Sequence, residues 1–174
     1  MSARLKRRGV MLNRIFPRQF DNNFRGHWLA VWLLVPVVLM RLVIGTNSMI
    51  NTHSVATGAD GIPVDSFGAA GSAQVLSLFA LQGLYGLTIA LLGVLVLLRY
   101  RAMIPLYYLL LLILQFGSRA LSLLHPTVHA GAATIGAGGI TAGALIVYGL
   151  LAVTIVGFIA SLVGRGYRSP AALT

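Results

Sequence analysis

Four long apolar stretches dominate this chain and constrain its fold more than any other feature. They run over about residues 28–47, 73–98, 103–124 and 139–163. Each reaches the roughly 20 residues that a helix needs to cross the core of a bilayer. Their residues are continuously apolar instead of alternating, which favours helices over the strands of a membrane barrel. The sequence therefore predicts an all-α membrane protein, a four-transmembrane-helix bundle.

Composition and charge narrow the class of protein further. Only 9% of the residues are charged, whereas a soluble domain carries roughly 25%. The net charge of +10 is explained by Lys and Arg at the ends of spans, so we expect no nucleic-acid partner. The chain has no cysteine, which excludes thiol redox chemistry and cysteine-ligated metal centres. We expect no cofactor.

The positive charges lie on one side of the predicted spans. Apart from Arg41 and Arg119, every Lys and Arg lies in residues 1–26, 99–101 or 165–168. The positive-inside rule then predicts that both termini are cytoplasmic, with a long outer loop over residues 48–71. The chain divides into a basic interfacial arm at 1–26, the bundle at 27–168 and a tail at 169–174. Aromatic side chains alternate with arginines in the arm, which is typical of an amphipathic segment at a membrane surface.

Two arginines interrupt the apolar spans. Arg41 and Arg119 lie at similar distances from the outer ends of spans one and three, so we expect them to share one layer. An arginine inside a membrane usually faces the bundle and has a partner. We expect Asp60 or Asp65 to fold back onto one of them, with Gln115 one turn below Arg119. These five residues form a candidate anion-binding site, and the alternative is snorkelling or a structural ion pair.

Span four carries small residues at helical spacing. Gly139 and Gly143 form a GxxxG pattern, and Ala160 with Gly164 repeats the spacing. Small residues let helices approach closely in lipid, either inside the bundle or against a partner subunit or second copy. Three glycines of span two could supply the complementary groove: Gly83, Gly86 and Gly93.

Catalytic and metal-binding patterns are weak. His125 and His129 have the spacing of a metal pair, but Pro126 separates them and no carboxylate follows, so no metal site is predicted. No serine lies in a nucleophile elbow. A membrane enzyme would have to use the aspartates and histidines of the two outer loops, and we rank it third.

Two sequence segments resemble a family of small bacterial integral membrane proteins of uncharacterised function. They are residues 16–23 (FPRQFDNN), which lead into Gly26 and His27, and the loop at 54–63 (SVATGADGIP). The resemblance implies a bacterial inner-membrane protein and carries no functional residue with it.

These observations predict a non-enzymatic protein. Its expected role is that of an accessory or scaffold subunit that packs against partner helices or lipid, in a homo-oligomer or a membrane complex. The alternative is a carrier or binding protein for an anionic or amphipathic small molecule at the arginine layer.

Overall fold

A computed structural model describes residues 15–16, 22, 24, 26–125, 134–135 and 140–163 of the chain. Four helices in these ranges are long and apolar enough to span a membrane, as the sequence predicts. They are α2 (Leu29–Ile50), α4 (Gly68–Leu98), α5 (Ile104–Leu124) and α6 (Ala142–Leu162). The interfacial arm and the C-terminal tail fall almost wholly outside the described residues.

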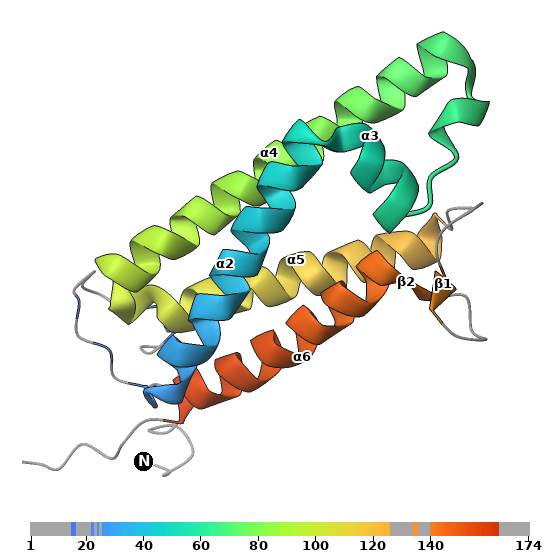
Figure 1. Cartoon of the computed structure of the whole chain (residues 1–174). Helices are drawn as coiled ribbons and strands as arrows, with labels where there is room; N and C mark the ends of the chain where they lie inside the picture. The colour runs from blue at the N-terminus through green and yellow to red at the C-terminus, as the bar shows by residue number, and fades with distance from the viewer. Residues whose placement is uncertain are drawn as a thin grey trace, which may run out of the picture.

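The helices form two pairs that meet at one end and diverge at the other (Figure 1). Helix α2 packs along α4 and, near its start, also against α6, which packs along α5. The meeting end contains the start of α2, the end of α4, the start of α5 and the end of α6. The main core lies near this end, where buried residues of α2, α4 and α5 form one cluster: Ala30, Val31, Leu34, Val37, Val38, Val96, Ile104, Tyr107, Tyr108 and Leu111.

Glycines bring α2 and α4 into backbone contact. A Cβ on Gly83 would lie 2.9 Å from the amide nitrogen of Met49 and 3.0 Å from the carbonyl oxygen of Gly45. A Cβ on Gly45 would lie 2.7 Å from the amide nitrogen of Leu87. Close approach at small residues gives helices in lipid the van der Waals contact that holds them together. Gly83 and Gly86 thus pack against α2, and Gly93 lies against Tyr107 of α5 and Val38 of α2, so none of the three supplies the groove for span four that we considered.

The connection between α2 and α4 is largely helical. It contains α3 (Thr52–Ser54), a π-helical turn η1 (Val55–Ala59) and a 3₁₀ turn η2 (Val64–Ser66). Ala56 and Val64 are buried with Phe79 of α4 in a second, smaller cluster. Helix α4 begins at Gly68, five residues before the predicted start, so this connection is shorter than the predicted loop.

The two remaining connections differ in length, with five residues between α4 and α5 and 17 between α5 and α6. The turn η3 (Arg101–Met103) joins α4 to α5. A two-residue antiparallel pair, β1 (Thr134–Ile135) with β2 (Ile140–Thr141), precedes α6. Helix α6 therefore begins three residues after the predicted start of span four at 139.

Candidate functional site

Arg41 lies within the apolar thickness of the bundle. It follows Trp28 by 13 residues on α2, about 20 Å along the helix axis, whereas a bilayer core is about 30 Å thick. Its Nε atom is buried and has no hydrogen-bond partner among the described residues. One turn earlier on α2, Val38 lies with Tyr107 of α5 beside Gly93 of α4. The structure therefore directs this charge into the bundle.

Arg119 has a different environment. Its guanidinium carbon lies 4.4 Å from the centroid of the Tyr148 ring, a cation–π contact between α5 and α6. Such contacts contribute about 0.5–1 kcal/mol at exposed sites. This contact gives Arg119 a structural partner that the sequence did not indicate, because an isolated tyrosine on span four carried no such signal.

The expected common layer of Arg41 and Arg119 does not form. Tyr107, which lies with Val38 beside Gly93 at a level one turn before Arg41, precedes Arg119 by 12 residues on α5, or about 18 Å of helix. Helices α2 and α5 also diverge towards the end where Arg119 lies (Figure 1). The two arginines therefore belong to separate environments.

The two aspartates of the α2–α4 connection have different neighbours. Asp65 Oδ1 is 3.0 Å from His53 Nε2, so Asp65 pairs with a histidine of α3 instead of with an arginine. Asp60 lies against α6, because a Cβ on Gly143 would be 2.8 Å from Asp60 Oδ1 and 3.0 Å from the carbonyl oxygen of Ala59. The connection thus bends back to touch the first turn of α6.

Gln115 occupies a buried polar position between α5 and α6. Only 4% of it is exposed, and its Nε2 donates to Thr154 Oγ1 at 3.1 Å. The Thr154 hydroxyl in turn donates to the carbonyl of Leu150 at 2.6 Å. The Oε1 atom of Gln115 is buried and has no partner within the described part of the chain. Buried polar atoms are usually satisfied, and among the side chains that the structure describes this acceptor and the Arg41 Nε donor are the two exceptions.

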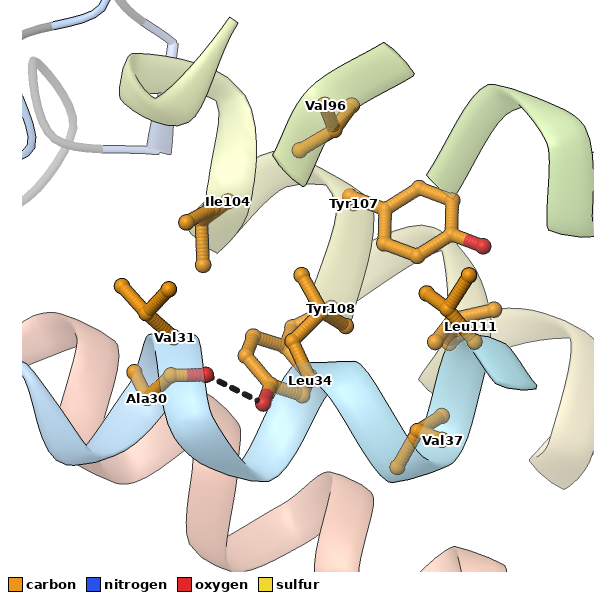
Figure 2. Packing of buried hydrophobic residues seen from close by; sticks show 10 residues of the cluster. Ala30, Val31, Leu34, Val37, Val96, Ile104, Tyr107, Tyr108 and Leu111 are labelled. Atoms are coloured by element: carbon orange, nitrogen blue, oxygen red, sulfur yellow. Dashed lines mark hydrogen bonds between the residues drawn. The ribbon is translucent and has the colours of Figure 1, made fainter. Parts of the chain in front are cut away.

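Two adjacent tyrosines of α5 join the other three helices, and the sequence reasoning missed them. Tyr107 donates to the carbonyl of Ile89 on α4 at 2.9 Å. Tyr108 donates to the carbonyl of Ala30 on α2 at 2.8 Å, as Figure 2 shows. The two adjacent tyrosines in an apolar span could have indicated these bonds, since a buried tyrosine hydroxyl usually finds a hydrogen-bond acceptor.

The small residues predicted for span four occupy different contacts. Gly143 faces Ala59 and Asp60, as described above. Ala160 packs against the main core, and its carbonyl accepts a hydrogen bond from the amide of His27 at 3.2 Å. Gly157, a further small residue of span four, contacts the Tyr108 ring. Gly139 and Gly164 lie outside the described residues.

No group of three or more metal-ligating side chains is present in the part of the chain that the structure describes. His125 directly follows α5, and His129 lies outside the described residues. Among the described polar side chains, Tyr107, Tyr108 and Gln115 form hydrogen bonds between helices.

Comparisons with protein-family models, curated proteins and solved structures give no match. The fold and the composition of its four spanning helices define a multi-pass helical membrane protein.

Proposed function

We propose that this chain is a non-enzymatic accessory or scaffold subunit that packs against partner helices or lipid. The observation that carries the proposal is a groove on the face of α2 that points away from the bundle, with a mostly apolar lining that also contains a pair of amide side chains. The groove has a volume of about 400 Å³, and six residues of α2 line it: Leu42, Val43, Thr46, Asn47, Ile50 and Asn51.

The groove lies opposite the packed face of α2. Gly45 and Ser48 are buried against α4, whereas Val43 is 63% exposed and Ile50 is 68% exposed. Asn51 Nδ2 donates to Asn47 Oδ1 at 2.7 Å, so the two amides form a polar pair on the outer surface. Thr and Asn side chains on a spanning helix form hydrogen bonds to neighbouring helices. A partner helix in the groove would satisfy the remaining amide donors and acceptors.

Purification from native membranes in a mild detergent tests this role. We expect a species heavier than the 18.5 kDa chain after correction for detergent, with a bound subunit or lipid identified by mass spectrometry. Asn47→Leu should release a bound protein subunit, because it replaces the amide that faces the groove. Ser118→Leu on the exposed side of α5 is the matched control and should retain it. A monodisperse wild-type monomer without subunit or lipid would refute the proposal.

We further propose that the protein lies in a bacterial inner membrane with both termini in the cytoplasm. The distribution of charge supports this topology: Arg99 and Arg101 lie at the end where α2 starts, while Asp60 and Asp65 follow the other end of α2.

The absence of cysteine makes this topology easy to test. A membrane-impermeant maleimide should label Ser66→Cys in intact spheroplasts. It should label Ala102→Cys only after the membrane is permeabilised. The reverse pattern would contradict the proposed orientation.

A second candidate function is a binding protein for an anionic amphipathic molecule at Arg41. It is favoured by the buried Nε donor of Arg41, which has no partner in the described ranges, inside an apolar bundle. A buried donor without a partner costs about 1–3 kcal/mol, so a carboxylate that reaches it would gain that energy. The separation of Arg119 from Arg41 restricts this candidate site to Arg41.

Thermal unfolding with octanoate and with the neutral octanol tests this candidate. Octanoate should raise the Tm of the wild type more than octanol does, since only the anion pairs with the guanidinium. The shift should vanish in Arg41→Gln and persist in Arg119→Gln. Equal shifts for octanoate and octanol in the wild type would exclude anion binding at this position.

A further inference from the structure

The end where the four helices meet carries a compact basic and aromatic surface. Arg101 of η3 lies over Trp28, which directly precedes α2, with 5.6 Å from the guanidinium carbon to the ring centroid. The amide of His27 donates to the carbonyl of Ala160 on α6 at 3.2 Å. Contacts from α2, η3 and α6 thus fix this surface in place.

The guanidinium of Arg101 is held in a defined orientation. Its Nε donates to the carbonyl of Leu97 at 3.0 Å, and its face lies over Trp28. A guanidinium has five N–H donors, and the Nε bond engages one of them. The four donors on the two terminal nitrogens have the fork geometry that suits phosphate oxygens.

Exposed apolar side chains lie beside this charge. Trp32 follows Trp28 by one helical turn and is 65% exposed. On α4, Leu95 is 53% exposed and Leu98 is 69% exposed, just before η3. Tryptophan favours the level of the headgroups, with its ring against the upper part of the acyl chains. The surface therefore presents a phosphate-binding group above an apolar face.

Acidic side chains of the described segments lie elsewhere. Both are in the connection that follows the far end of α2, where Asp65 pairs with His53 and Asp60 lies against Gly143. Neither of these two described carboxylates therefore lies beside Arg101, and an anionic headgroup of the membrane matches its charge.

We infer that this end binds the headgroup of an anionic phospholipid, with the phosphate at Arg101 and the upper acyl chain along Trp28 and Trp32. Basic sites at the ends of spanning helices bind anionic lipids in this way. This lipid site rests on the proposed function, which names lipid as one of the partners. It assigns the lipid class and the residues that recognise it.

The tryptophans supply a local probe, since the two in the chain, Trp28 and Trp32, both lie at this surface. The experiment reconstitutes the protein in phosphatidylcholine and titrates phosphatidylglycerol with brominated acyl chains, which quench tryptophan fluorescence. Brominated phosphatidylcholine is titrated in parallel. We expect stronger quenching by the anionic lipid at equal mole fraction.

Arginine variants separate a site from diffuse attraction. Arg101→Gln should lower the preference for phosphatidylglycerol by about fivefold, the effect expected of one basic residue at the membrane surface. Arg99→Gln is the matched control, because it removes the same charge two residues away but leaves the Trp28 contact intact. Its effect should be clearly smaller, and Arg101→Lys should restore part of the preference. Trp28→Phe should retain part of the preference for phosphatidylglycerol, which the fluorescence of Trp32 still reports.

Two results would overturn the inference. One is equal quenching of the wild type by the two lipids, which does not depend on the folding of any variant. The other is an equal loss in Arg99→Gln and Arg101→Gln, which would show diffuse charge in place of a site. Neither result bears on whether a subunit co-purifies, so the accessory role would be tested separately.

Discussion

The contact between Tyr108 and Gly157 leads to a sharp prediction about stability. Tyr108 is completely buried, and a Cβ on Gly157 would overlap its hydroxyl and Cζ and lie 2.6 Å from its Cε1. Carbon atoms normally approach to about 3.5–4.0 Å, so Gly157→Ala would require the ring or helix α6 to move by about 1 Å. The ring is also held by its hydrogen bond to Ala30, which makes a free shift impossible.

The expected loss of stability can be estimated from these two restraints. Overpacking of a core costs about 1–3 kcal/mol. If the ring moves, the hydrogen bond to Ala30 weakens as well, and a bond of this kind contributes about 0.5–1.5 kcal/mol. We therefore expect Gly157→Ala to lower the free energy of unfolding by about 2–4 kcal/mol.

Reversible unfolding in mixed micelles of mild detergent and dodecyl sulfate, followed by circular dichroism, provides the measurement. Gly149→Ala on the same helix is the matched control, because no atom outside its own helix turn lies within 4 Å of the added Cβ. It should be neutral or stabilising by up to about 1 kcal/mol, since Ala favours helix over Gly. The double variant Tyr108→Ala with Gly157→Ala should lose less than the sum of the single losses. If Gly157→Ala proves as stable as Gly149→Ala, the packing described here is wrong.

The other predictions use the same unfolding assay. Tyr107→Phe removes the donor to Ile89 but leaves no polar group unpaired, so it should cost only about 0.5–1.5 kcal/mol. Gln115→Leu should be nearly neutral, because it removes an amide whose Oε1 is already without a partner in the described structure. Thr154→Val keeps the shape of the side chain but leaves Gln115 Nε2 unpaired, so it should cost about 1–3 kcal/mol; a smaller loss than that of Gln115→Leu would contradict the assigned bond. Asp65→Asn should change stability by less than about 1 kcal/mol, because the pair with His53 is exposed.

The four spanning helices could be predicted because the membrane imposes a simple rule on the sequence. A helix that crosses the core needs about 20 apolar residues, and the boundaries of that run are visible in one dimension. Helix α5 begins within one residue of its predicted start and ends at Leu124 as predicted. The predicted start of α4 was too late, because Gly68 and Gly71 are residue types typical of turns. In the structure the Ser72 hydroxyl donates to the carbonyls of Val64 and Gly68, and this first turn packs beside η2.

The contacts between helices were harder to predict, because they depend on which faces meet. Glycines of span two were visible, but nothing in the sequence showed that Gly83 would meet Gly45 or that Gly93 would lie against Tyr107. The helical structure of the α2–α4 connection was equally hard to predict. Its glycines and proline favour turns, whereas the burial of Ala56 and Val64 against α4 depends on tertiary packing.

The two arginines show why depth alone does not define a site. Counting residues from the ends of two spans gives a common depth only if the helices are straight, parallel and level at their ends. Here the α2–α4 and α5–α6 pairs diverge, so equal distances from the helix ends correspond to positions that are far apart (Figure 1). Long side chains add a second displacement, because helical side chains point towards the N-terminus of their helix. Arg41 lies one turn beyond the contact of Val38 with Tyr107 near the meeting end, whereas Arg119 lies over Tyr148 further along α5. Two charges within spanning helices should therefore be assigned to one site only when their neighbours, and not their depths, coincide.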